Sequence, residues 1–183
     1  MTTTVKKLVL SAMFLSLGLL LPFLTAQIPE IGKALLPMHI PVILCGFICG
    51  WQYGLTVGFI TPLLRSAVFS MPVFFPMAVG MAFELAAYGL LCGVLYRLLP
   101  RKKLCVYPAL LLSMIGGRLV YGAFMFLLAG LSDRVAYSLS LFLSGTVLKA
   151  IPGIILQIVL IPVILIALEA AGLVPVKGRQ PQP

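Results

Sequence analysis

Six apolar runs, separated by short polar or proline-containing breaks, dominate the 183-residue chain. We expect helices over residues 8–26, 39–49, 54–69, 77–96, 104–130 and 139–172. About 20 apolar residues are enough for an α-helix to cross a bilayer, although the second run is shorter than this. The pattern therefore predicts an all-α integral membrane protein, folded as a single domain over residues 1–183 into a bundle of six transmembrane helices.

The breaks between the runs differ in composition. Residues 51–53, which are Trp-Gln-Tyr, are expected to form a turn at the membrane interface, because amphipathic rings favour headgroup depth. Residues 70–76 contain two prolines and are expected to form a loop. Its large side chains would form an apolar flap that either covers a ligand or lies in the interface: Met71, Phe74 and Phe75. Pro152 and Pro162 are expected to kink the long last run.

Composition excludes a soluble protein. Hydrophobic residues make up 62% of the chain and charged residues only 9%, against roughly 25% in soluble domains. The chain has one histidine, four acidic residues and no glycine-rich phosphate-binding loop. We therefore expect no enzyme activity, no metal centre and no cofactor. The four cysteines lie within or beside apolar runs, so a disulfide framework is not expected either.

Basic residues orient the predicted bundle. With the N-terminus inside, segments 1–7, 97–103 and 173–183 carry eight lysines and arginines, whereas the outer loops carry only Lys33 and Arg134. Cytoplasmic loops are enriched in Lys and Arg, so both termini and the basic loop 97–103 are predicted to be cytoplasmic. The net charge of +9 thus reflects orientation in a lipid bilayer, and no nucleic-acid partner is expected.

Three cations remain inside the runs or at their ends: Arg65, Arg118 and Lys149. A charged side chain at the centre of a membrane helix costs about 2.5–3.5 kcal/mol on an insertion scale, so it is normally paired or faces a bundle interior. Glu84 is the acidic residue available at this depth. We expect the four side chains to meet in an outward-facing chamber, where an anionic ligand would neutralise part of the positive excess.

Helical spacing adds three candidate ligand contacts. Tyr121 follows Arg118 by three residues, Thr146 precedes Lys149 by three, and His39 begins the second run. The alternatives are that Arg65 extends toward the lipid headgroups, that Glu84 and Arg118 form a purely structural ion pair, and that His39 only terminates a helix.

The chain resembles the substrate-binding S components of energy-coupling factor (ECF) transporters. The resemblance covers nearly the whole chain. It is carried by the basic N-terminus, the small residues Ala12 and Ser16 on the first helix, and the motif Pro-Met-His-Ile-Pro-Val at 37–42 with the glycines and proline that follow: Gly46, Gly50, Gly54, Gly58 and Pro62. It implies a vitamin-capture protein of the bacterial plasma membrane, with one ligand held near the outer face beside loops 28–38 and 70–76.

The resemblance also implies partners. Ala12 and Ser16 would dock onto a transmembrane coupling protein that carries two cytoplasmic ATPases, although the family's motif has two alanines. The excess of cations favours a carboxylate-bearing substrate, with pantothenate the leading candidate and folate, biotin, nicotinate and lipoate as others. Two alternatives are an autonomous proton-coupled secondary transporter with Glu84 as its relay, and a structural membrane protein without a ligand.

Overall fold

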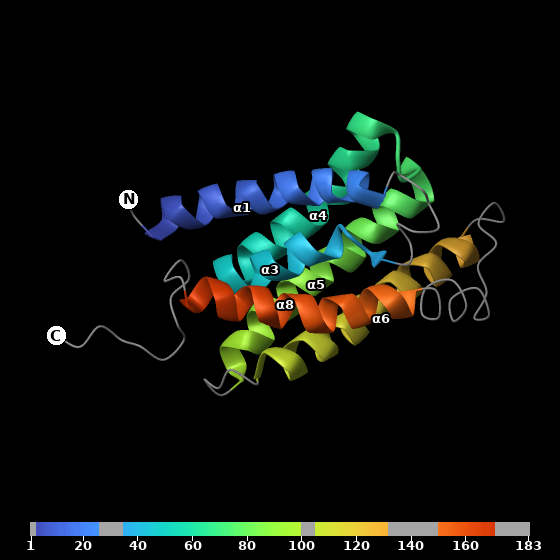
Figure 1. Ribbon diagram of the computed structural model, residues 1–183. Helices are drawn as coiled ribbons and strands as arrows, with labels where there is room; N and C mark the ends of the chain where they lie inside the picture. The colour runs from blue at the N-terminus through green and yellow to red at the C-terminus, as the bar shows by residue number, and fades with distance from the viewer. Residues whose placement is uncertain (1–2, 26–34, 100–104, 132–149, 171–183) are drawn as a thin grey trace.

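The computed structural model describes residues 3–25, 35–99, 105–131 and 150–170, and these residues are almost entirely helical (Figure 1). The long helices are α1 (Thr3–Leu20), α3 (His39–Cys49), α4 (Trp51–Phe69), α5 (Val79–Leu98), α6 (Val106–Leu131) and α8 (Ile151–Ala170). Two short helical turns complete the described elements: η1 (Leu21–Thr25) follows α1, and η2 (Phe74–Ala78) precedes α5. The described part of the chain contains no strand, which confirms the all-α prediction.

Four described segments are long and apolar enough to cross a membrane: Thr4–Phe23, Phe74–Leu98, Val106–Leu131 and Ile151–Ala170. Helix α3 has 11 residues and is shorter, as its sequence predicts. The start of α1 and the end of α8 lie at the same end of the bundle (Figure 1). That this end is cytoplasmic, and that the chain crosses the bilayer six times, stay predictions.

The chain reverses direction at Gly50, between α3 and α4. Gly50 has φ +103° and ψ 169°, a conformation that is accessible mainly to glycine. Across this turn, a Cβ placed on Gly54 would lie 2.7 Å from Cα of Gly46. The predicted interfacial turn at 51–53 is therefore wrong: these residues form the start of α4, and the turn is made by the glycine before them.

Glycines bring α4 against α5. A Cβ on Gly54 would lie 2.6 Å from the carbonyl oxygen of Gly89, and one on Gly58 would collide with the backbone at Leu85. Neither position accepts a side chain without movement of a helix. Two glycines four residues apart, Gly54 and Gly58, thus allow the backbones of the two helices to approach closely.

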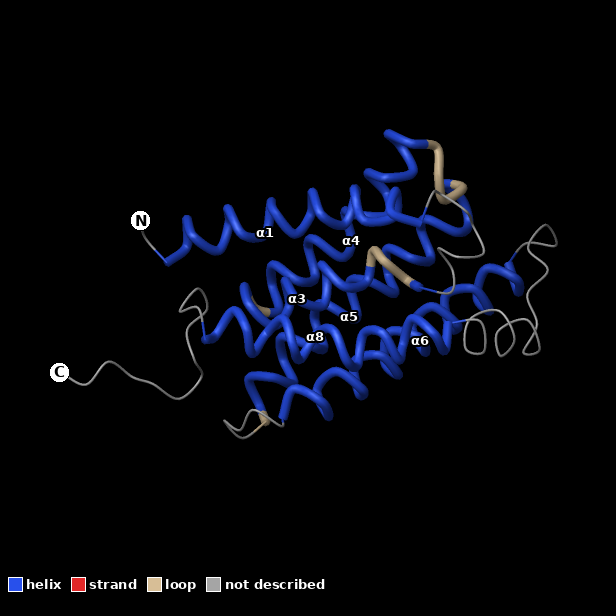
Figure 2. Tube along the Cα trace, viewed as in Figure 1, coloured by secondary structure: helices blue, strands red, loops and turns tan. Residues whose placement is uncertain are grey.

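The proline-containing segments are only partly as expected. Residues 70–73 form a loop, held by a 2.7 Å hydrogen bond from Ser66 Oγ to the carbonyl oxygen of Pro72. Residues 74–76 fall within η2 (Figure 2), but Phe75 keeps an extended backbone there, with φ −121° and ψ 133°. Pro152 lies in the first turn of α8, where a missing N–H breaks no helical hydrogen bond. Pro162 lies inside α8. Residues 139–149 of the expected last helix lie outside the described residues.

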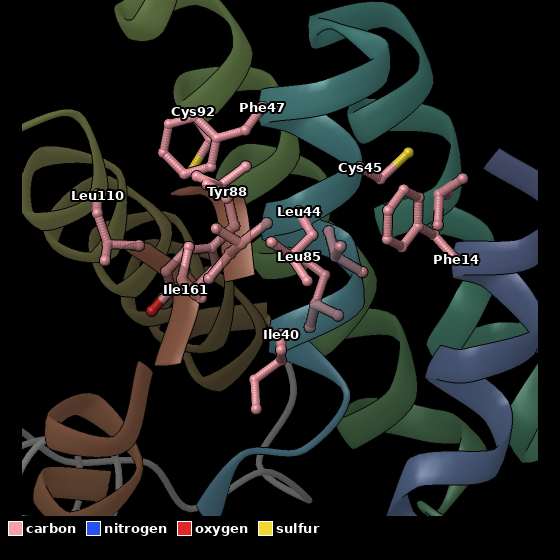
Figure 3. Close-up of a cluster of buried hydrophobic side chains, with 14 of the residues drawn as sticks. Phe14, Ile40, Leu44, Cys45, Phe47, Leu85, Tyr88, Cys92, Leu110 and Ile161 are labelled. Carbon is pink, nitrogen blue, oxygen red and sulfur yellow. The ribbon is translucent and has the colours of Figure 1, made fainter. Parts of the chain in front are cut away.

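The core surrounds α3. All residues of this helix except Ile48 are buried. On one side Phe14 of α1 packs onto it, and on the other lie Tyr88 of α5, Leu110 of α6 and Ile161 of α8 (Figure 3). Helix α3 is therefore the centre of the described bundle, and a polar group on it is enclosed by neighbouring helices.

Candidate binding site

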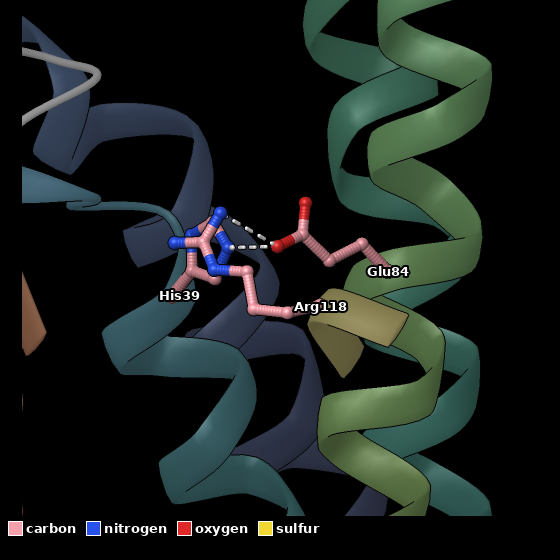
Figure 4. Close-up of polar contacts among 3 residues, drawn as sticks. All are labelled: His39, Glu84 and Arg118. Carbon is pink, nitrogen blue, oxygen red and sulfur yellow. Dashed lines mark ion pairs between the residues drawn. The ribbon is translucent and has the colours of Figure 1, made fainter. Parts of the chain in front are cut away.

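Three predicted site residues meet in the interior and form the charged cluster, defined here as His39, Glu84 and Arg118. Arg118 Nη1 lies 3.1 Å and His39 Nε2 lies 3.6 Å from Glu84 Oε1 (Figure 4). The side chains are 1%, 3% and 13% exposed for His39, Glu84 and Arg118. The cluster is held by electrostatic attraction between three helices, α3, α5 and α6, and is shielded from the surroundings.

Local structure fixes these positions. His39 begins α3, and its backbone N–H donates to the carbonyl oxygen of Leu36 at 3.0 Å. Tyr88 follows Glu84 by one turn of α5, and its ring packs edge-to-face on His39 with centroids 5.1 Å apart. Gly117, the neighbour of Arg118, leaves room for this ring, since a Cβ there would lie 2.6 Å from it. The Tyr88 ring thus packs against the His39 ring and helps to hold it in place.

The cluster has unused hydrogen-bonding capacity. Within the described residues, both ring nitrogens of His39 and the Nε and Nη2 of Arg118 are buried without a hydrogen-bond partner. Nε and Nη2 form the side of a guanidinium that binds a carboxylate through two parallel hydrogen bonds. Figure 4 shows part of the guanidinium turned away from Glu84. The free edge of Arg118 is therefore suited to an acceptor pair on a ligand.

Gln157 is a polar core residue that the sequence analysis did not select. It is fully buried on α8, and neither amide atom has a hydrogen-bond partner in the described structure. Helix α8 packs against α3 and α6, which carry His39 and Arg118. The available signal was a single amide in an apolar run, and such residues in membrane helices usually face the protein interior.

Arg65 lies elsewhere. Its Nη1 donates to the carbonyl oxygen of Leu19 at 2.6 Å, and its guanidinium lies 5.1 Å and 5.5 Å from the ring centroids of Phe23 and Phe69. Its side chain is 4% exposed, so the surrounding helices enclose it. The structure places Arg65 between the end of α1 and the end of α4, and does not bring it into the charged cluster.

Of the three remaining predicted ligand contacts, Tyr121, Thr146 and Lys149, only Tyr121 lies within the described residues. Tyr121 packs against α5, since a Cβ on Gly80 would lie 3.0 Å from its ring. Thr146 and Lys149 lie outside the described residues. Among the residues that are described, no group of three His, Cys, Asp or Glu side chains is arranged to hold a metal ion.

Helix α1 presents two faces. Ser11, Phe14 and Gly18 are buried against the bundle, whereas the predicted docking residues Ala12 and Ser16 are exposed. Ser16 Oγ donates to the carbonyl oxygen of Ala12 at 3.0 Å, which satisfies the hydroxyl within the helix. Apart from Thr4, Lys6 and Lys7 near its start, the rest of the exposed side is apolar, with Val5, Leu8, Val9, Met13, Leu17 and Leu20.

Comparisons with known proteins identify one family. The family model described as "ECF transporter, substrate-specific component" matches residues 6–165. No curated protein and no solved structure matches the chain.

Proposed function

Because this chain belongs to the family of substrate-specific components of ECF transporters, we propose that it captures a small carboxylate-bearing metabolite in the charged cluster. Pantothenate is the leading candidate. The observation that carries this proposal is the unpartnered, buried Nε–Nη2 edge of Arg118. A buried donor pair that lacks a partner destabilises the empty protein, and a carboxylate would satisfy both donors at once.

The balance of charges in the charged cluster differs from the one expected from the sequence. Glu84 already neutralises Arg118, and Arg65 is engaged with α1, so the described cluster carries less positive excess than the sequence suggests. The preference for a carboxylate therefore rests on the geometry of Arg118 and on Lys149 as a proposed second cation. Tyr121 and Thr146 remain proposed contacts, and His39 would add a donor or an acceptor.

A partner must supply the energy for uptake. Substrate-specific components act with a membrane coupling protein and ATPases, and we propose that the exposed face of α1 is where this coupling protein docks in a bacterial plasma membrane. Small side chains at Ala12 and Ser16 allow a second helix to approach closely. ATP hydrolysis by two cytoplasmic ATPases would then drive the conformational change that releases the substrate inside.

The test is a binding measurement on purified protein. Isothermal titration with pantothenate is expected to give a dissociation constant in the nanomolar to micromolar range. Arg118→Ala should weaken it at least tenfold, about 1.4 kcal/mol, and Arg118→Lys should rescue little because lysine lacks the paired donors. Arg97→Ala, at an exposed arginine near the end of α5, is the control and should leave affinity unchanged. Equal affinity of wild type and Arg118→Ala rejects the site.

A second candidate function is proton-coupled secondary transport. The buried His39–Glu84 contact of 3.6 Å is the arrangement that favours it, because ionisable side chains enclosed within a membrane helix bundle are typical of ion and proton pathways. Uptake of pantothenate into liposomes that contain this chain alone, driven by a pH gradient and abolished by Glu84→Gln, would support this function. Uptake only with the coupling protein and ATPases would reject it.

A further inference from the structure

We propose that Gln157 contacts the substrate and selects metabolites that carry an amide or ureide group in addition to a carboxylate. This inference rests on the proposed function and narrows its substrate class. Arg118 would bind the carboxylate, and the side-chain amide of Gln157 would form hydrogen bonds with the adjacent donor and acceptor of the second group.

The first support is the burial of an unpaired amide. Gln157 is 0% exposed, yet neither Oε1 nor Nε2 has a hydrogen-bond partner in the described residues. A buried amide without partners disfavours the folded state, whereas leucine or methionine of similar size would pack without this penalty. As a core residue alone, Gln157 is therefore unfavourable, and a polar ligand would satisfy it.

The second support is the position of Gln157. Helices α5 and α8 run in the same direction through the bundle (Figure 1). Gln157 precedes Ile161 by one turn, as Glu84 precedes Tyr88, and Ile161 and Tyr88 belong to the same buried cluster (Figure 3). Gln157 is thus expected at about the depth of the charged cluster, on a helix that packs against the helices of His39 and Arg118.

The third support is complementary chemistry. The free edge of Arg118 offers only donors, which suits a carboxylate. The amide of Gln157 offers one acceptor and two donor hydrogens, which suits the N–H and C=O of an amide or ureide. Pantothenate, biotin and folate carry both groups, whereas nicotinate and lipoate carry the carboxylate alone. A contact with Gln157 would therefore favour pantothenate, biotin and folate over nicotinate and lipoate.

The experiment titrates wild-type protein and variants with these five metabolites. At least one of pantothenate, biotin and folate should bind ten times more tightly than nicotinate and lipoate. Gln157→Leu should weaken that binding at least tenfold while raising the melting temperature of the ligand-free protein. Gln157→Met serves as a second apolar variant in case the branched side chain prevents folding, and the same result is expected.

The outcomes separate this inference from the proposed function. If Arg118→Ala loses affinity but both Gln157 variants keep it within twofold, Gln157 is only structural and the inference is overturned. Tightest binding of nicotinate or lipoate by the wild type overturns it as well. Binding of none of the five metabolites overturns the inference together with the carboxylate class.

Discussion

The ion pair between Glu84 and Arg118 is the residue-scale feature with the clearest energetic consequence. Removing one partner of a buried pair typically costs about 3–5 kcal/mol, because a charge is left uncompensated, whereas replacing both by apolar residues is often neutral. Glu84→Leu should therefore lower the melting temperature strongly. The double variant Glu84→Leu with Arg118→Met should recover most of the stability but not pantothenate binding.

Thermal unfolding in detergent and isothermal titration measure the two effects. Full transport activity by the double variant in cells would contradict a binding role, and would support a purely structural ion pair.

Arg65 is expected to stabilise the bundle without touching the substrate. Its hydrogen bond to the carbonyl oxygen of Leu19 and its position over Phe23 and Phe69 connect α1 to α4. Arg65→Gln should cost about 1–3 kcal/mol of stability, because the buried contacts of the guanidinium are lost. Melting temperature should fall while the dissociation constant for pantothenate stays within twofold. A tenfold loss of affinity with an unchanged melting temperature would instead place Arg65 in the site.

At the scale of elements, the glycine contact between α4 and α5 sets the spacing of the helix that carries Glu84. A Cβ on Gly89 would collide with the backbone at Gly54, and neither helix backbone can yield locally. Gly89→Ala is expected to destabilise the protein by about 1–3 kcal/mol through overpacking. Gly130→Ala is the matched control, because the new Cβ on this glycine of α6 would meet no atom within 4 Å beyond its chain neighbours and the backbone of its own helix.

Differential scanning fluorimetry measures the melting temperatures of the Gly89→Ala and Gly130→Ala variants. The control should be neutral or slightly stabilising, since alanine favours a helix by about 1 kcal/mol over glycine. A Gly89→Ala variant as stable as the control would mean that the two helices are not packed this closely.

The exposed face of α1 should matter for transport and not for binding. Ala12→Leu would separate the helix from a coupling protein, whereas the bundle side of α1, with Phe14 and Gly18, is unchanged. We expect normal pantothenate affinity but impaired uptake in cells that contain the coupling module. Ala123→Leu makes the same change at an exposed alanine of α6 and should leave uptake intact. Equal uptake by both variants would remove α1 as the docking helix.

Helix positions were largely predictable, because apolar runs and prolines have strong local effects. The reversal at Gly50 was not placed correctly, since the aromatic residues after it gave a competing interfacial signal. Glycine conformation depends on the packing of α3 against α4, which a single sequence does not specify. Pro152 lies in the first turn of α8, and residues 139–149 before it lie outside the described residues, so the kink expected there stays a prediction.

At the scale of the whole molecule, the sequence identified the charged residues and predicted only part of their pairing. Glu84, Arg118 and His39 meet as expected because they lie at similar depth on neighbouring helices. Arg65 has the same charge as Arg118 but contacts a backbone carbonyl and two aromatic rings. These contacts depend on how α1 packs against α4. Gln157 was missed because a single amide carries no charge and no motif. Its significance comes only from complete burial without a partner.

Native mass spectrometry of protein purified from cells in a mild detergent tests whether this chain holds a small metabolite through Arg118. We expect a co-purifying mass that matches a carboxylate-bearing metabolite, present on the wild type and on Arg97→Ala and absent from Arg118→Ala. A bare protein mass in all three, or the same bound mass on Arg118→Ala as on the wild type, would rule out the proposed role of Arg118.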